Sequence, residues 1–387
     1  MVNALADLIR ISNAVGKDPA LTQAFGGNTS VKTDDGKFMF IKESGTALKD
    51  MTAKRGWRKM RIAPVLSVIK DNALARLPPD SREPLVVNRL LAAASDNIKK
   101  GGPPSVESHL HALLDKCVIH LHPLVIGAYV SSKNGRRKIA KLFEKENVPP
   151  LWIPYAPPGF LLARKVARFV DGYRKSYRKM PSVMFLAKHG LFITAKTPAI
   201  ALTLLNRVIK KCKSNLPKSR PLRLHPPSVQ SLQTAQSAVR QALLNVTRKV
   251  LPVSFIFNKD VADFIRRPDA ARLLAAGALG PAELVYANGP PLWIENPTVE
   301  KITAKLKTLL NRGRKPPTAF VVKGLGLFIA AQKKAIPLIT DVAVGSLMVR
   351  NWASRLGGVL PLTQSEQDFI INWCSELSRL AVRLRRP

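Results

Sequence analysis

Residues 117–123 read CVIHLHP, a stretch that sets two histidines, His120 and His122, two positions apart in an apolar run. The run from Val118 to Leu124 has the composition of a strand, and residues two apart on a strand point to the same side. Two imidazoles on one face suit a metal ion. Two half-buried histidines bonded to the backbone would give the same pattern, so this stretch leaves both interpretations open.

A second strand that ends in a histidine favours the metal. Residues 181–195, PSVMFLAKHGLFITA, predict a strand, a glycine turn and a second strand, with His189 directly before Gly190. A catalytic zinc site uses three protein ligands and leaves one position open. We therefore predict that His120, His122 and His189 bind Zn²⁺ or another divalent metal.

Two polar turns are candidates for binding an anionic substrate. Residues 24–32, AFGGNTSVK, combine two glycines with Asn28, and residues 43–48, ESGTAL, repeat this chemistry with Ser44 and Gly45. Such turns can hold a phosphate through backbone and side-chain donors. A plain tight turn between a helix and a strand explains the first of them equally well.

Glu107 is the candidate general acid/base. It lies in residues 103–111, PPSVESHLH, where Ser105 is a plausible N-cap of a helix. A carboxylate in a first helical turn has an ordinary explanation in the helix dipole, and a functional one as a proton carrier close to the metal. His109 and His111 are two apart on the same helix and diverge, so neither is predicted to be a metal ligand.

The length of 387 residues indicates two domains, and a hydrophobic content of 46% is enough for full cores. Strand-like and helix-like segments alternate through the first half of the chain. Residues 61–77 are expected to begin near a strand and continue as polar loop, and residues 81–98 and 105–116 are expected to be helices. The proline-rich stretch 214–228 is the best candidate for a linker.

An internal repeat follows the linker candidate. Residues 181–195 align without gaps to 317–331, PTAFVVKGLGLFIAA, and Leu325 replaces His189. Chance likeness of two apolar segments is the alternative to a degenerate second copy. We predict a metal-binding domain over 1–215, a degenerate second domain without the metal histidines over 225–345, and C-terminal helices over 346–387.

The chain is strongly basic, with 62 Lys and Arg against 25 Asp and Glu and a net charge of +37. The basic residues are scattered, so most are predicted to occupy solvated helix faces. A charge of this size attracts polyanions without specificity. We expect weak, salt-sensitive binding to nucleic acid rather than a specific nucleic-acid function.

The cysteines and the apolar runs of the chain indicate which cellular compartment to expect. Cys117, Cys212 and Cys374 are odd in number and far apart, so they form neither a disulfide framework nor a CxxC zinc site. A reducing, cytoplasmic setting is expected. No apolar run approaches the roughly 18 residues that a membrane span needs, so no membrane partner is predicted.

Six strings in order resemble the class II aldolase/adducin family: FGGNTSVK, IKESGTAL, PPSVESHLH, VIHLHP, IPYAPPGFLLA and KHGLF. The likeness covers about residues 5–212 and is closest to the aldolase portion of bacterial rhamnulose-1-phosphate aldolase/dehydrogenase fusions. Those fusions also carry a region similar to GPAELVYANGPPLWI and VKGLGLF. A Gly-rich dinucleotide fingerprint is missing here, so we expect the dehydrogenase activity to be absent.

The resemblance implies a fold and a site. The family fold is a three-layer α/β/α domain with a largely antiparallel sheet, here followed by a second degenerate α/β domain, and homo-oligomers are common. The family's zinc ligands fall on His120, His122 and His189, and its acid/base falls on Glu107. Its phosphate-holding positions fall on Asn28, Ser44, Gly45 and Ser105.

The implied activity is a zinc-dependent retro-aldol cleavage of a ketose 1-phosphate, similar to rhamnulose or fuculose phosphate, to dihydroxyacetone phosphate and an aldehyde. An epimerase, dehydratase or decarboxylase would use the same ligands, and an adducin-like scaffold without catalysis is a further alternative. Glu43 departs from the family pattern beside the phosphate loop, where its charge would repel phosphate unless Lys42 or Lys32 compensates. An unphosphorylated substrate is therefore another alternative.

Overall fold

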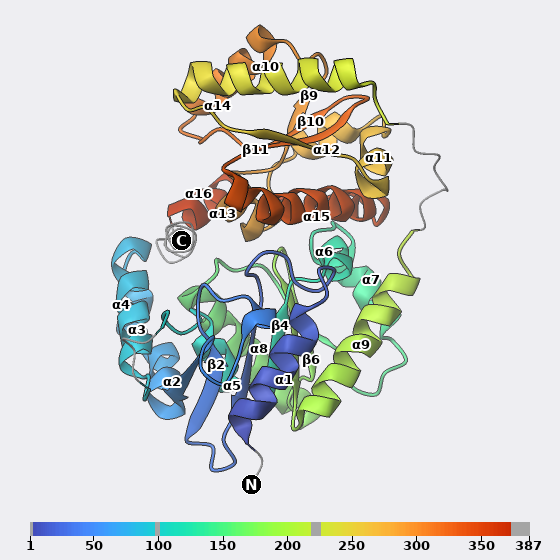
Figure 1. The fold of residues 1–387 in the computed structure, drawn as a ribbon. Coiled ribbons are helices and arrows are strands. Elements are labelled where there is room, and N and C mark those ends of the chain that lie inside the picture. Colours follow the sequence, from blue (N-terminus) through green and yellow to red (C-terminus); the bar gives the residue numbers. More distant parts are fainter. Residues whose placement is uncertain (1–2, 97–100, 218–225, 373–387) are drawn as a thin grey trace. The chain divides into compact units, whose positions relative to one another are not determined.

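The computed structural model describes residues 3–96, 101–217 and 226–372, which form two compact units (Figure 1). Of the described residues, unit 1 comprises 3–96, 101–130, 134–216 and 368–372, and unit 2 comprises 131–133, 217 and 226–367. The division after Leu216 falls inside the stretch 214–228 predicted as a linker, of which residues 218–225 lie outside the described part.

Unit 1 is built on a seven-stranded sheet in which only the β5–β6 pair is parallel. This confirms the largely antiparallel sheet predicted for the first domain. In spatial order the strands are β3 (Trp57–Arg61), β2 (Phe38–Lys42), β1 (Asn28–Lys32), β4 (Cys117–Leu121), β7 (Gly190–Ala195), β6 (Val183–Leu186) and β5 (Leu151–Ile153).

Helices cover both faces of this sheet, giving the predicted three layers (Figure 1). One face carries α1 (Ala4–Gly16) and α9 (Pro198–Ser214), and the other carries α2 (Ile62–Lys70), α5 (Ser108–Leu113) and α8 (Phe160–Tyr177). The remaining helices of the unit are η1 (Leu48–Asp50), α3 (Asn72–Arg76), α4 (Pro79–Ala92), α6 (Leu124–Val130) and α7 (Gly135–Leu142).

Residues 61–77 do not form the predicted polar loop, because α2 begins directly after β3 and α3 follows α2. Ile62, Val65 and Ile69 lie on one buried face of α2 at helical spacing. Pro64 falls in the first turn of α2. Backbone N–H groups there have no acceptor within the helix, so the N–H that proline lacks is not needed. α5 is also shorter than the helix predicted over 105–116, because it begins after Glu107 and ends at Leu113.

Unit 2 contains a four-stranded sheet in the order β8 (Val253–Ile256), β11 (Gly326–Ala330), β10 (Ala319–Val322) and β9 (Leu292–Ile294). The helices described after α9 in the chain are α10 (Val229–Thr247), α11 (Lys259–Ile265), α12 (Ala270–Ala275), α13 (Pro281–Ala287), α14 (Val299–Asn311), η3 (Lys333–Ala335), α15 (Ile336–Arg355) and α16 (Gln364–Asn372). The predicted boundary between 225–345 and 346–387 falls inside the continuous helix α15, and residues 373–387 lie outside the described part.

The second sheet copies one half of the first. The order β8-β11-β10-β9 matches β4-β7-β6-β5, and in both sets the last pair is parallel while the other two pairs are antiparallel. The tripeptide Leu-Trp-Ile forms both β5 and β9, at 151–153 and 292–294. The repeat seen between 181–195 and 317–331 therefore extends over four strands.

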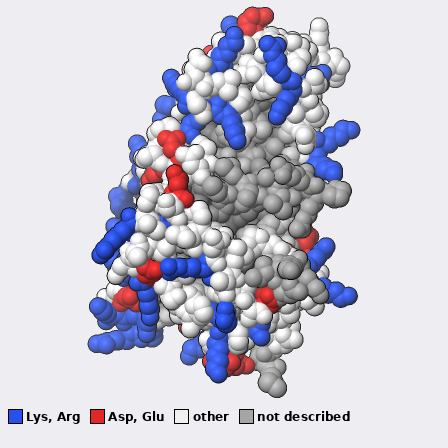
Figure 2. All heavy atoms as spheres, turned by 90° about the vertical axis from the view of Figure 1, so that its left-hand side faces the viewer, with Lys and Arg blue, Asp and Glu red and all other residues white. Residues whose placement is uncertain are grey.

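Basic side chains are spread over the described surface and do not gather into one patch on the face drawn in Figure 2. Among residues 3–96, 101–217 and 226–372, no helix combines the length and the apolar character needed to cross a bilayer.

A buried ion pair joins two helices of unit 2. Arg350 of α15 donates to Glu283 of α13 over 2.6 Å and also to the carbonyl of Gly277 over 2.9 Å, and both charged side chains are almost fully enclosed. Burial alone raises the pKa of Glu283, and the Arg350 charge opposes that rise. The pair holds together segments that are far apart in the sequence.

Breaking this pair should destabilise unit 2. Arg350→Met leaves the buried carboxylate of Glu283 without its cationic partner, so we expect the free energy of unfolding of unit 2 to fall by about 3–5 kcal/mol. Hydrogen–deuterium exchange of α13 and α15 peptides measures the loss. The matched control is Arg272→Met, which removes an exposed pair with Asp269 and should cost less than about 1 kcal/mol. Equal losses in the two variants would contradict the argument.

Candidate metal centre

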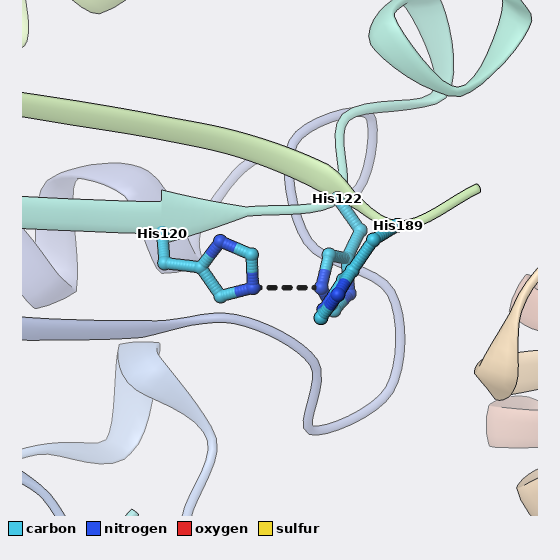
Figure 3. Close-up of side chains that lie close together, drawn as sticks. All are labelled: His120, His122 and His189. Carbon is cyan, nitrogen blue, oxygen red and sulfur yellow. Dashed lines mark hydrogen bonds between the residues drawn. The ribbon is translucent and has the colours of Figure 1, made fainter. Parts of the chain in front are cut away.

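Three histidines meet at one end of the unit 1 sheet (Figure 3). His120 lies near the end of β4 and His122 directly follows that strand, while His189 lies in the turn between β6 and β7. The antiparallel pairing of β4 with β7 aligns His120 with Phe192 and so brings the His189 turn to the end of β4. The three residues come from two segments that the sequence alone does not place side by side.

The spacing of the ring nitrogens suits one metal ion. One ligand atom from each histidine lies within 4.8 Å of the others, and His120 Nε2 is 3.0 Å from His122 Nε2. In a tetrahedral zinc site with Zn–N bonds of about 2.0–2.1 Å, two nitrogens are about 3.3 Å apart. Small side-chain adjustments would bring the three nitrogens to this spacing, so the group could hold a metal ion.

Contacts behind His120 fix which nitrogen faces the centre. Its Nδ1 is 3.1 Å from the carbonyl oxygen of Leu191, so Nδ1 carries the proton and donates it there. The ring also stacks on Phe192, with centroids 4.1 Å apart. A ligating histidine is normally held in this way through its second nitrogen. The Nε2 lone pair of His120 is therefore left to face His122 and His189.

Two glycines allow the histidine-bearing segments to approach. Gly27 adopts φ +74°, and a Cβ there would lie 2.7 Å from the carbonyl oxygen of His120. A Cβ on Gly190 would lie 2.6 Å from the His122 ring. A side chain at Gly27 or Gly190 would displace a proposed ligand. Gly27, the second glycine of the GG pair in residues 24–32, therefore has a role in packing against the centre.

Burial keeps His120 and His122 neutral. It lowers the pKa of His120, which is completely enclosed, and the pKa of His122, where the neighbouring His120 and His189 lower it further. Neutral imidazole is the form that binds metals.

Glu107 adjoins this group. Its carboxylate lies 3.4 Å from His120 Nε2 and 3.5 Å from His189 Nε2, and it accepts a 2.7 Å hydrogen bond from Asn28 Nδ2. Burial by itself would raise the pKa of Glu107. The positive charge that His120 and His189 acquire as the pH falls, together with the Asn28 amide, outweighs burial and holds the pKa of Glu107 below its ordinary value. A charged carboxylate therefore stands beside the three imidazoles.

The predicted phosphate positions divide into two places. Ser44, Gly45 and Ser105 come together, because the Ser44 N–H donates to Pro103 over 2.7 Å and the Ser105 N–H donates to Lys42 over 3.1 Å. Gly45 has φ +86° with open space beside its Cα. Asn28, in contrast, uses both ends of its side-chain amide within the protein, on Glu107 and His111.

Arg58, which was not among the bases considered from the sequence, lies beside Glu43 and pairs more closely with Asp96, over 2.8 Å. Arg58 Nη2 lies 3.6 Å from the Glu43 carboxylate, which also accepts hydrogen bonds from Thr46 Oγ1 over 2.6 Å and from the Gly102 N–H over 3.1 Å. Lys32 instead donates to the carbonyl groups of Ala112 and Leu114 at the end of α5. Glu43 thus holds the loop together.

Comparison with known proteins identifies unit 1. Residues 6–216 match the family model of the class II aldolase and adducin N-terminal domain. The chain belongs to this family. Among curated proteins it is similar to the uncharacterised oxidoreductase YuxG of Bacillus subtilis (strain 168), at 24% identity over 420 residues that cover 97% of this chain. The match spans only 58% of the length of that relative.

Solved structures of the same kind are also similar. The N-terminal class II aldolase domain of a conserved protein from Thermoplasma acidophilum is 26% identical with a TM-score of 0.45, over 55% of this chain and 94% of that one. A sugar-phosphate aldolase from Thermotoga maritima is 13% identical with a TM-score of 0.39, over 55% and 92%.

His111 of the class II aldolase domain received no role from its sequence. It is fully buried, and its Nδ1 lies 2.7 Å from Ser30 Oγ while its Nε2 bonds Asn28 Oδ1. The three histidines whose ring nitrogens gather are His120, His122 and His189. The missed signal was its spacing from Glu107, because residues four apart lie on one face of a helix.

Unit 2 carries apolar residues at all three positions of the centre. His120 pairs with Phe192, and the repeat places Phe255, which pairs with Phe328, at the equivalent of His120. Phe257 then corresponds to His122, and Leu325 corresponds to His189. Leu325 packs against the hydrophobic core of unit 2, so its surroundings are apolar.

Replacing one ligand by its unit 2 counterpart should abolish metal binding. We expect His189→Leu to weaken Zn²⁺ affinity by about 100-fold or more, because two imidazoles cannot complete the tripod. Isothermal titration calorimetry of metal-free protein measures it. Leu325→Ala in unit 2 is the matched control and should leave the affinity unchanged. Retention of wild-type affinity by His189→Leu would exclude His189 as a ligand.

Acid should destabilise metal-free unit 1 well above the pH of ordinary acid denaturation. Burial lowers the pKa of His109 to about 4 and that of His111 to about 3. Between pH 6.5 and 4 the unfolded chain therefore binds protons that the folded chain does not, so the free energy of unfolding falls as pH falls. Each histidine contributes about 2 kcal/mol of loss between pH 6.5 and 5.

Hydrogen–deuterium exchange of β4 and β7 peptides at pH 7, 6 and 5, corrected for the intrinsic exchange rate, measures this loss. His109→Gln removes one titrating group and should reduce the loss by about 2 kcal/mol. A pH-independent stability in this range would show that these histidines are not buried in neutral form.

Proposed function

We propose that the protein is a metal-dependent carbon–carbon lyase that cleaves a ketose 1-phosphate to dihydroxyacetone phosphate and an aldehyde, with Zn²⁺ as its metal. The observation that carries the proposal is the convergence of three imidazoles on a charged carboxylate, Glu107, within 3.5 Å of two of them. A scaffold protein has no need of such a buried arrangement. Membership of the class II aldolase and adducin family supports an enzyme with this chemistry.

The donor set fits zinc. Three neutral histidines with one open position are a common catalytic zinc arrangement, and the Leu191 contact presents Nε2 of His120 as the donor. When bound, the metal supplies Lewis-acid stabilisation of the negative charge that develops on a substrate oxygen during carbon–carbon cleavage.

Glu107 is proposed to move the proton at carbon. A general base has to lie within hydrogen-bond reach of its proton and be ionised at the working pH. Glu107 adjoins the position that the histidines leave open, and its lowered pKa keeps it ionised. Asn28 holds one carboxylate oxygen, Oε2, which leaves Oε1 as the atom for proton transfer.

The loops around Ser44 and Ser105 are proposed to hold the phosphate. The Gly45 turn is open on one side, and the hydroxyl of Ser44 remains able to donate to a ligand in place of the Pro104 carbonyl, 3.2 Å away. Arg58 lies beside Glu43 but also pairs with Asp96 over 2.8 Å, so it weakens, and does not cancel, the repulsion of an anion beside this loop. The open Gly45 turn and the Ser44 hydroxyl are what favour a phosphorylated substrate over an unphosphorylated one.

A panel of ketose 1-phosphates, including those of rhamnulose and fuculose, tests the reaction with zinc-loaded protein. Release of dihydroxyacetone phosphate from one of them supports the lyase. If zinc-loaded protein releases dihydroxyacetone phosphate from none of these substrates, the lyase proposal is wrong. Isomerised, dehydrated or decarboxylated products would point to the epimerase, dehydratase or decarboxylase alternatives, and no turnover of any kind would point to the scaffold.

The variant Glu107→Gln should keep the metal and lose turnover. The amide preserves shape but cannot accept the proton, so we expect kcat/KM to fall by about 100-fold or more. Metal content by elemental analysis and initial rates on the best substrate measure the two effects. The control Glu144→Gln changes an exposed carboxylate and should leave both unchanged. Full activity in Glu107→Gln would contradict the assigned role.

A further inference from the structure

Four buried side chains form a chain of hydrogen bonds that ends on Glu107. Ser30 Oγ contacts His111 Nδ1 at 2.7 Å, His111 Nε2 contacts Asn28 Oδ1, and Asn28 Nδ2 contacts Glu107 Oε2 at 2.7 Å. All four residues are nearly or fully enclosed. The direction of each hydrogen bond follows from chemistry alone.

An ionised carboxylate can only accept, so Asn28 must turn its NH₂ group toward Glu107. The Asn28 oxygen then faces His111, which has to donate from Nε2. A neutral imidazole carries one N–H, so Nδ1 is left as an acceptor and Ser30 donates its hydroxyl proton to it. Burial lowers the pKa of His111 to about 3, which keeps the ring neutral.

The fold explains why these residues meet. Asn28 pairs with His120 and Ser30 pairs with Val118 across β1 and β4, so both side chains lie on the sheet face that carries His120. α5 covers that face, with Glu107 directly before it and His111 within its last turn. Two residues of one strand are thereby joined to two residues spaced one helical turn apart.

We propose that His111 is a positioning residue, which as the Nε2–H tautomer fixes the orientation of the Asn28 amide and through it the carboxylate of Glu107. An amide has nearly the same shape when its oxygen and nitrogen are exchanged, so shape does not prevent a flip. A flipped Asn28 would set an oxygen against the charged carboxylate, and the two would repel. The N–H of His111 makes that flip unfavourable.

The tautomer can be read directly. In long-range proton–nitrogen correlation spectra of protein labelled with nitrogen-15 histidine, His111 should show a protonated Nε2 and an unprotonated Nδ1. His111→Gln assigns the signal by its disappearance. An Nδ1–H tautomer, or a doubly protonated ring at pH 7, would overturn the proposal. This measurement is independent of the reaction that the protein catalyses.

A matched pair of variants tests the consequence for turnover, which rests on the proposed lyase function. His111→Gln places an amide N–H where Nε2 was, whereas His111→Asn reaches only the position of Nδ1. We expect kcat of His111→Asn to fall by about 10- to 100-fold with KM little changed, and His111→Gln to recover most of the loss. Zinc affinity should be unchanged in both.

Equal losses in the two variants would assign His111 a purely structural role and overturn the proposal. If the wild-type protein cleaves no ketose phosphate, the proposed lyase function is wrong. The tautomer measurement still tests whether His111 donates to Asn28 from Nε2. The two failures are thus distinguishable.

Discussion

The antiparallel pairing of β4 with both β1 and β7 is the interaction on which the candidate centre depends. It aligns Asn28, His120 and Phe192 across three strands. Every other feature of the centre follows from this alignment, because it presents His120 to the face covered by α5 and brings the His189 turn to the end of β4. A shift of β4 by one residue would turn its histidines to the opposite face.

Much of this arrangement could be predicted from sequence. The HLH spacing on an apolar strand and the KHG turn after another strand indicate the two ligand-bearing ends, and the six ordered strings indicate the class II aldolase family. These signals are local, so a single pass along the chain finds them. The sheet order, which brings the strands together, is non-local, and the resemblance supplied only the expectation of a largely antiparallel sheet.

Features that depend on side-chain partners could not be predicted. Arg58 lies beside Glu43 from a neighbouring strand, and nothing in the local sequence distinguishes it from Lys42 or Lys32. Asn28 was assigned to phosphate because amides can bind it, but its amide is engaged by Glu107 and His111. The helix α2 was not predicted, because Pro64 and the preceding strand made the helical spacing of its few buried apolar residues hard to recognise.

The turn that carries His189 keeps its backbone conformation in unit 2. Lys188 has φ +56°, and its counterpart Gly324 has φ +75°, so both turns pass through the left-handed region at the same position. The two copies differ in their side chains at the ligand positions and not in the path of the chain around them. The fold of this turn therefore does not depend on the histidines: unit 2 forms the same strands and the same left-handed position with Phe255, Phe257 and Leu325 in their places.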